Sequence, residues 1–258
     1  MGKVRFERDG AVGIITLADP PLNLVSPEMM SELDAAVSEA HDSDVRAVLV
    51  KADGDAFSAG ANVDSMFQGR NPRSAHALIS GAGRATMHAE QLPMPTICAV
   101  HGMCLAGGLE VALACDVIWA AEDATLGQIE AVIGAMPFGG GAQRLASCCG
   151  PYRAREIVYG GRMYTAQEFE RWNIVSRVLP FSELHEKALK YAQRLAAGPT
   201  LAYAATKRTI REMLDSGVRA SDAIIPDLSA PLFESADLKH GIESLLKNGP
   251  GQARFAGK

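Results

Sequence analysis

The sequence predicts an α/β fold with a layered core and a helical C-terminal region. Apolar runs of strand length alternate with longer segments of helical periodicity as far as residue 179. From Ser182 onward the pattern is almost entirely helical, and no internal repeat is visible. A chain of 258 residues can bury one full core, so we expect a core domain at residues 1–198 and a helical region at residues 199–258.

The expected elements begin with two strands and a helix, after which strands and helices alternate. The strands are expected at residues 4–8, 12–17, 46–51, 96–100, 116–121 and 174–179. Helices are expected to start after Ser26, a cap residue followed by proline, and at residues 71–91, 108–114, 139–148, 152–159 and 166–172. Asp9-Gly10 is a typical hairpin turn. Breaks in the C-terminal helices are expected at Pro199, Pro226 and Pro231.

Composition and charge argue against several classes of protein. The chain carries 25 Lys and Arg against 30 Asp and Glu, a net charge of −5, so we expect no nucleic-acid partner. No segment approaches the roughly 18 consecutive apolar residues of a membrane helix. The first residues lack the apolar segment of a secretory signal, and the five cysteines form no disulfide framework. We therefore expect no membrane association and a cytoplasmic location.

One cysteine and histidine pattern resembles a metal site in its spacing. Cys98, His101 and Cys104 are each three residues apart. However, Cys98 and His101 should point to opposite faces at the end of a strand, and no second cluster completes four ligands. We therefore expect no metal site.

Two stretches of small residues carry the strongest functional signal, residues 57–62 (FSAGAN) and residues 102–110 (GMCLAGGLE). Small residues let backbone N–H groups approach a ligand closely, because little or no side chain intervenes. The second stretch runs into a helix, whose first N–H groups lack intrahelical partners and lie at the positive end of the helix dipole. Two such groups from separate loops, converging on one oxygen, would form an oxyanion hole for the enolate of a thioester.

Two glutamates lie close to these stretches in the sequence. Glu110 falls in the first turn of the helix begun by Gly107-Gly108, and Glu130 follows a short extended segment. Two carboxylates near one water molecule can orient it and share its proton transfers. Taken singly, each glutamate is more typical of a surface position, and the glycine-rich turn alone is more typical of a packing or anion-binding device. The turn matches neither the phosphate-binding loop nor the dinucleotide fingerprint.

In combination, these segments resemble the crotonase (enoyl-CoA hydratase/isomerase) superfamily over essentially the whole chain. Residues 57–62 are similar to its F-x-A-G-A-D loop, residues 100–110 to its segment in which V-x-G precedes G-G-x-E, and residues 127–145 to its G-x-P-E and P-x-x-G-G-x-x-R-L stretches. The resemblance implies a crotonase-like β-β-α spiral core with a C-terminal helical region that takes part in trimerisation. The chain departs from the family pattern at Asn62, where aspartate is usual, and at Ala106, where glycine is usual.

The resemblance also implies a role for each matching residue. Ala59 and Gly107 would supply the two N–H groups of the oxyanion hole. Glu110 and Glu130 would be the catalytic pair, with Glu110 acting as a base toward water and Glu130 as the acid that protonates C2. Coenzyme A would be part of the substrate, and no separate cofactor is expected. The residues implied to bind coenzyme A are Ala59, Gly60, Ala61, Asn62, Gly107, Phe255 and Lys258.

We therefore expect an enoyl-CoA hydratase, which adds water to a trans-2-enoyl-CoA and gives a 3-hydroxyacyl-CoA. Two alternatives stay open. One is a 3-enoyl to 2-enoyl-CoA isomerase, which needs a single acid–base group, and the other is a non-catalytic RNA-binding or scaffold protein that keeps the fold. The paired glutamates favour the hydratase over the isomerase, and together with the acidic charge balance they argue against the non-catalytic protein.

The residues beyond Pro199 predict an assembly of several copies. This region holds more apolar residues than a surface appendage needs, among them Leu201, Ile210 and Leu214. Together with the resemblance, this predicts a homotrimer or a hexamer in which the C-terminal helices pack between subunits. Phe255 and Lys258 would then reach the nucleotide of a neighbouring subunit, unless the terminus is frayed.

Overall fold

A six-stranded sheet forms the centre of the molecule. The computed structural model describes residues 2–258. The strands of this sheet are β1 (Val4–Asp9), β2 (Val12–Leu17), β3 (Ala47–Ala52), β4 (Thr96–Val100), β6 (Val117–Ala121) and β9 (Arg177–Leu179), in the spatial order β1-β2-β3-β4-β6-β9. The pair β1 and β2 is antiparallel, as the hairpin at Asp9-Gly10 requires, and the four other pairs are parallel. All six strands fall within about three residues of their predicted positions.

A second, smaller sheet carries the loops of the candidate site. Its strands are β5 (Met103–Leu105), β7 (Thr125–Gly127) and β8 (Tyr164–Thr165), in the order β5-β7-β8. Strands of two or three residues are too short to show a period of two, so the sequence pattern does not predict β5 or β8. β5 leads directly into the glycine-rich helix start, and β7 precedes the second glutamate.

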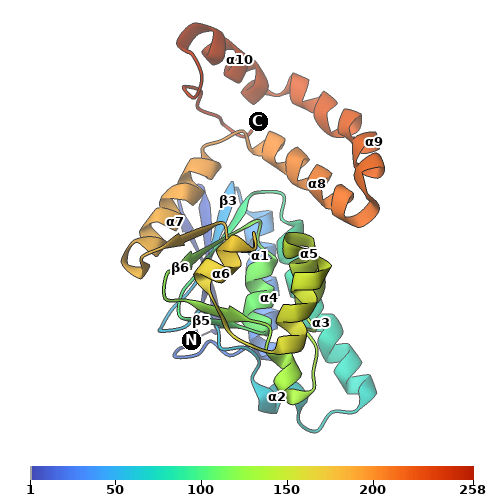
Figure 1. Cartoon of the computed structure of the whole chain (residues 1–258). Helices are drawn as coiled ribbons and strands as arrows, with labels where there is room; N and C mark the ends of the chain where they lie inside the picture. The colour runs from blue at the N-terminus through green and yellow to red at the C-terminus, as the bar shows by residue number, and fades with distance from the viewer. Residues whose placement is uncertain (1) are drawn as a thin grey trace.

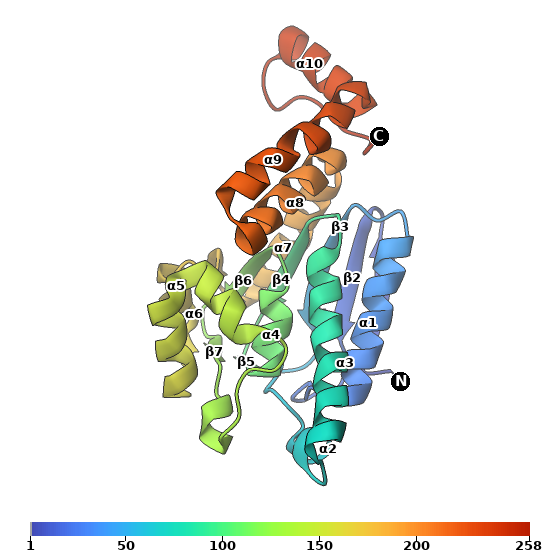
Figure 2. The ribbon, with the colours of Figure 1, turned by 90° about the vertical axis from the view of Figure 1, so that its right-hand side faces the viewer.

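Helices cover both faces of the large sheet (Figures 1 and 2). The helices of the core are α1 (Pro27–Asp42), α2 (Val63–Phe67), α3 (Pro72–Gln91), α4 (Gly107–Leu113), α5 (Gly141–Gly160), α6 (Ala166–Arg171) and α7 (Phe181–Ala196), with a short 3₁₀ helix η1 (Glu130–Ile133). α1 and α3 pack side by side on one face, and α7 packs against β3, β4 and β6 from the other (Figure 2). Ser26 caps α1 by accepting the Met29 N–H (3.1 Å), as the sequence predicts.

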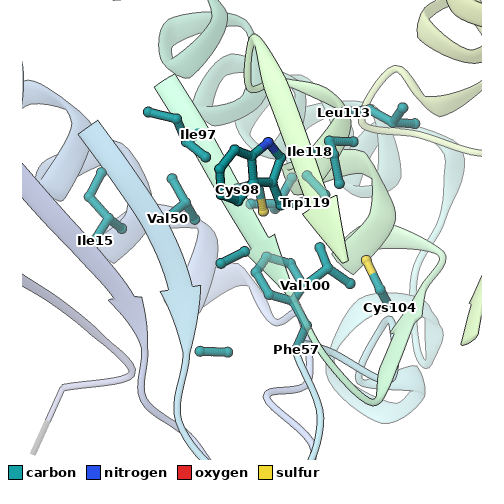
Figure 3. Close-up of a cluster of buried hydrophobic side chains, with 14 of the residues drawn as sticks. Ile15, Val50, Phe57, Ile97, Cys98, Val100, Cys104, Leu113, Ile118 and Trp119 are labelled. Carbon is teal, nitrogen blue, oxygen red and sulfur yellow. The ribbon is translucent and has the colours of Figure 1, made fainter. Parts of the chain in front are cut away.

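The core is a continuous cluster of apolar side chains from the large sheet and the helices on it (Figure 3). Phe57, which lies just before the first candidate loop, is fully buried among side chains such as Val50 and Val100. Burying a side chain of this size contributes roughly 2–3 kcal/mol. The base of the candidate loop is therefore held in place by core packing.

The C-terminal region stands at one end of the core (Figure 1). It consists of α8 (Thr200–Ser216), α9 (Val218–Ser229), the 3₁₀ helix η2 (Ala230–Glu234) and α10 (Ala236–Asn248). The predicted breaks at Pro199 and Pro231 lie outside the α-helices, whereas the prediction for Pro226 is wrong, because α9 continues through this residue. A proline inside a helix removes one backbone hydrogen bond, which raises the free energy of the helix without necessarily ending it.

The side chain of Arg46 ties the C-terminal region to the core. It donates to the Thr200 hydroxyl (2.9 Å) and to the carbonyl oxygens of Gly198 (2.6 Å) and Phe255 (3.0 Å). Whether residues 1–198 and 199–258 behave as separate domains stays a prediction. Among residues 2–258, no helix combines the length and the apolar character needed to cross a membrane.

Candidate active site

The first predicted loop runs between β5 and the segment before α1. The Ser58 N–H donates to the Met103 carbonyl, and the Leu105 N–H donates to the Ser58 carbonyl (both 2.9 Å). On the other side, the Val25 N–H donates to the Gly60 carbonyl and the Asn62 N–H donates to the Val25 carbonyl (both 2.8 Å). These bonds hold residues 58–62 on both sides and leave the N–H of Ala61 unused.

The structure changes the assignment of Ala59 to the oxyanion hole. The Ala59 N–H already donates to the Leu22 carbonyl (2.9 Å), so it is not available to a ligand. Ala61 lines a cavity instead, and its N–H has no hydrogen-bond acceptor among residues 2–258. Gly60, with a φ of 100°, redirects the chain between the two alanines. The available N–H of this loop is therefore that of Ala61.

The second loop brings Gly107 to the same cavity. The Ala106 N–H donates to the Gly127 carbonyl (2.8 Å), and α4 begins at the next residue. The Gly107 N–H belongs to the first helical turn and finds no acceptor in the described part of the chain. A Cβ on Gly108 would lie 2.4 Å from the Ser58 Cβ, so the helix start packs tightly against the first loop. The cavity is thus lined by two residues with free N–H groups, from two loops.

Both predicted glutamates line this cavity, which has a volume of about 40 Å3. A volume of this size accommodates a water molecule or two. The remaining walls come from α1, α2, α3 and the turn before α5, and they are mostly apolar. The centroids of the Phe67 and Phe138 rings, for example, lie 6.0 Å apart at one side of the cavity.

Glu110 is buried and is held by backbone N–H groups of the turn before α5. Its Oε1 accepts from the N–H of Gly139 (2.7 Å) and from the N–H of Gly141 (2.9 Å). Burial raises the pKa of the Glu110 carboxyl, whereas these two N–H groups and the nearby Arg144 act in the opposite direction. A Cβ on Gly139 would come within 2.9 Å of Oε2 of Glu110, so only glycine lets the turn approach the carboxylate this closely.

Glu130 is the first residue of η1, and it is also buried. The amide of the fully buried Gln128, oriented as its hydrogen-bond network requires, donates to Oε1 (2.6 Å) and Oε2 (3.0 Å) of Glu130. Burial raises the pKa of Glu130 to about 7; the neighbouring charge of Glu110 adds to this rise, and a hydrogen bond from its own N–H opposes it. A carboxyl with this pKa is present in both protonation states near neutral pH, as a group that gives and regains a proton must be.

This fold and this pair of loops agree with a family model described as enoyl-CoA hydratase/isomerase, which matches residues 7–252. The chain belongs to the enoyl-CoA hydratase/isomerase family. The crotonase fold and its C-terminal helices, which the sequence predicts, are confirmed by the solved structures of the family.

Similar proteins support this family membership at moderate sequence identity. A probable enoyl-CoA hydratase of Rhizobium meliloti is 35% identical over 247 residues, which cover 93% of each chain. A probable mitochondrial enoyl-CoA hydratase of Dictyostelium discoideum is 32% identical over 93% of this chain and 87% of its own length. The crystal structure of an enoyl-CoA hydratase from Bacillus anthracis superposes with a TM-score of 0.92 at 27% identity, and the match covers 99% of this chain and all of the other.

Three residues that bind the carboxylates of the candidate site are not identified as functional by the sequence analysis. Gln128 lies two residues before Glu130, and Gly139 and Gly141 lie about thirty residues after Glu110, yet all three bind the two carboxylates. The available signal is the run of three glycines at a helix start, because such a turn exposes several N–H groups. In this structure the N–H groups of that turn bind the Glu110 carboxylate.

The residues implied to bind coenzyme A separate into two groups. The first group, on the two loops at the cavity, consists of Ala59, Gly60, Ala61, Asn62 and Gly107, and the Asn62 side chain caps α2 by accepting the Ser65 N–H (3.0 Å). Phe255 and Lys258 form the second group, in the C-terminal segment, and the end of this segment lies away from α4 within one chain (Figure 1).

The terminus itself is held by hydrogen bonds. The Asp237 carboxylate accepts from the N–H groups of Ala256 (2.7 Å) and Gly257 (2.8 Å). The Asp237 N–H in turn donates to the Lys258 carbonyl (3.0 Å). A frayed terminus does not agree with these contacts, so the last residues have a defined position.

His101, which belongs to the cysteine and histidine pattern with metal-like spacing, has a structural role in the fold. It is buried, and its Nε2 donates to the Gly54 carbonyl (2.9 Å). Its ring packs against those of Phe181 and His185, while Cys98 and Cys104 are buried in the apolar core.

Proposed function

We propose that this protein is an enoyl-CoA hydratase, which adds water to a trans-2-enoyl-CoA and gives a 3-hydroxyacyl-CoA. The observation that carries the proposal is the joint arrangement at one cavity of two buried carboxylates and two free backbone N–H groups. Glu110 and Glu130 supply the carboxylates, and Ala61 and Gly107 supply the N–H groups. An isomerase that only moves a double bond needs one acid–base group, so the second carboxylate favours hydration.

In this proposal the thioester oxygen binds between the N–H groups of Ala61 and Gly107. Both groups stabilise negative charge on this oxygen, so the conjugated double bond is polarised and C3 becomes electrophilic. A single donor of this kind contributes about 3 kcal/mol to lowering the barrier of acyl transfer. The reaction needs no metal or cofactor, because the N–H groups take the place of a Lewis acid.

The two glutamates then divide the proton transfers. Glu110, as carboxylate, takes a proton from water while the water oxygen bonds to C3. Glu130, protonated, gives its proton to C2, so that H and OH are added and the thioester oxygen regains its double bond. A proton passes from Glu110 back to Glu130 to restore the starting state. The pKa of about 7 suits Glu130 to this role at neutral pH.

The test is the hydration of crotonyl-CoA, which is monitored through the decrease in absorbance of the conjugated thioester. We expect that Glu110→Gln and Glu130→Gln each lower kcat by about a hundredfold or more, because each removes one proton-transfer group. The matched control is Glu243→Gln on the exposed face of α10, which should leave the rate unchanged. Near-normal turnover by either cavity variant would remove that residue from the mechanism.

A 3-enoyl-CoA substrate separates hydratase from isomerase. If the wild-type protein converts a 3-enoyl-CoA to the conjugated thioester but does not hydrate crotonyl-CoA, it is an isomerase. If it does neither, the family fold serves a non-catalytic role in this protein.

A further inference from the structure

Thr86 lines the cavity and Arg144 lies behind the Gly139 turn, and neither has a role in the proposed chemistry. Thr86 is on α3, and its side chain is only 1% exposed. Its hydroxyl donates to the Gly139 carbonyl oxygen (2.8 Å) and also lies 3.0 Å from the carbonyl of Gly83. Arg144 is on α5, and its Nη1 donates to the same Gly139 carbonyl (2.9 Å).

Gly139 therefore has hydrogen bonds at both of its backbone polar groups. Its carbonyl oxygen accepts from two side chains on two different helices, and its own N–H donates to Oε1 of Glu110. A turn that contains three consecutive glycines has many accessible conformations, so its geometry depends on such external contacts. The two contacts select the conformation in which Gly139 and Gly141 both point their N–H groups at the carboxylate.

Arg144 is itself held in position by an ion pair. Its Nη2 donates to Oε2 of Glu90 (2.7 Å), and the side chain of Arg144 is only 11% exposed. Glu90 lies one helical turn after Thr86, so a single face of α3 provides both the hydroxyl and the partner of Arg144. The backbone carbonyl of Glu90 also accepts from Arg211 of α8. An arginine that is largely buried and donates to two different acceptors restricts the orientation of both of them.

We propose that Thr86 and Arg144 are positioning residues for Glu110, which fix the Gly139 turn so that its N–H groups hold Oε1 and leave Oε2 for the reaction. The proposal rests on the proposed function, because it assigns Oε2 to the reacting water. Neither side chain needs to touch the substrate for this role. They act on Glu110 indirectly, by fixing the backbone of Gly139.

The positioning has a consequence for the acidity of Glu110. The N–H groups of Gly139 and Gly141 favour its ionised form, so loosening the turn raises the pKa of this carboxyl further. The charged groups that act on this part of the site are Arg144 from α5, which favours ionisation, and Glu130 from η1, whose charge is coupled to that of Glu110. Since Glu110 must be ionised to accept a proton from water, loosening the turn moves the acidic limb of the pH–rate profile to higher pH.

The experiment compares Thr86→Val, Thr86→Ser and Arg144→Gln in the full-length protein. Thr86→Val keeps the shape of the side chain and removes the hydroxyl. We expect kcat to fall about five- to tenfold with KM nearly unchanged, and the acidic limb to move up by about half a pH unit. Thr86→Ser, which keeps the hydroxyl, should restore both quantities. Arg144→Gln should move the acidic limb further, because it removes a positive charge as well as a hydrogen bond.

The control for the charge change is Arg153→Gln, which lies beyond the break at Gly150 in α5 and pairs with Glu156 at the surface. It should leave kcat and the pH profile unchanged. The pKa of the Glu110 carboxyl, followed by NMR in labelled protein, gives a second readout that does not require turnover. If wild-type protein fails to hydrate crotonyl-CoA, the proposed function fails, and the NMR titration still reports the positioning.

Two results would overturn the proposal. One is a Thr86→Val variant with the wild-type kcat and acidic limb. The other is a Thr86→Val variant that loses activity while the titration of Glu110 stays unchanged, which would mean that the hydroxyl serves only to stabilise α3 through Gly83.

Discussion

The core and the C-terminal region use their apolar residues in opposite ways. In the core, apolar side chains such as Leu33, Leu49 and Leu126 are at most 2% exposed. Within residues 199–258, all of which the structure describes, the buried side chains are those of Ser221, Asp237 and Ser244, and none is apolar. The apolar side chains of α8–α10 are half-buried or exposed, and Leu214, Phe233 and Leu246 are 52%, 72% and 82% exposed.

This difference explains how each region keeps its structure. The core is stable through apolar burial within one chain, which contributes most of the free energy of folding in a domain of this size. The C-terminal helices are held within one chain by half-buried apolar side chains and by polar contacts, such as the Arg46 and Asp237 hydrogen bonds. An apolar surface of this extent usually covers an interface, and we propose that it packs against further copies of the chain in a trimer or hexamer.

The largest effect should come from a polar substitution on the exposed apolar face of α8. We predict that the double variant Ile210→Asp and Leu214→Asp dissociates the assembly and abolishes activity, because two charges would be buried at the interface. Light scattering gives the mass, and circular dichroism should show that the helices remain. The matched control is Arg208→Asp, on an exposed position of the same helix. A wild-type protein that is a fully active monomer would show that this surface has another purpose.

A smaller effect is expected from the buried charge in the core, and it depends on pH. The pKa of Glu130 is about 7 in the folded protein against an ordinary value of 4.5, so the folded state binds this proton more tightly than the unfolded state. The contribution of this carboxyl to stability is complete below pH 4.5 and is lost as the pH rises through 7. At about 1.4 kcal/mol per pKa unit, the loss is at most about 3.5 kcal/mol.

We therefore predict that Glu130→Gln is more stable than the wild type at pH 8 and that the advantage shrinks toward pH 4.5. Chemical denaturation at the two pH values measures the difference. The exposed Glu243→Gln serves as the control, since it removes a carboxylate without removing a buried charge. An advantage that is the same at both pH values would mean that packing, rather than ionisation, distinguishes the two side chains.

The smallest predicted effect concerns backbone strain just before α4. Ala106 has a φ of 48° and a ψ of −122°, a conformation that favours glycine, and glycine is usual at this point of the family pattern. We predict that Ala106→Gly raises the free energy of unfolding by about 1 kcal/mol, because the relief of strain exceeds the entropic cost of glycine. Ala112→Gly, in the helix that follows, should instead lower it by about 1 kcal/mol. Equal destabilisation by the two variants would show that Ala106 is not strained.

The sequence alone determines the family and most of the architecture. Strands with clear periodicity, the Ser26 cap and the Asp9-Gly10 hairpin depend on neighbouring residues, and neighbours are visible in a sequence. The same is true of the position of Glu110 in the first turn of α4, because it lies only two and three positions after Gly108 and Gly107, which begin the helix. Taken singly, neither glutamate stands out, and it is their combination with the family pattern that predicts both of them as residues of the candidate site.

The tertiary structure decides which groups of the candidate site are available and how acidic they are. The Ala59 N–H donates to the Leu22 carbonyl, whereas the Ala61 N–H has no acceptor among residues 2–258. This distinction depends on a segment more than thirty residues away in the sequence. The Gly139 turn approaches Glu110 through the packing of α3 and α5 against α4. The pKa of Glu130 likewise depends on how far the fold removes it from water. Hydrogen-bond partners and burial are properties of groups that meet in space, so no local pattern in the sequence specifies them.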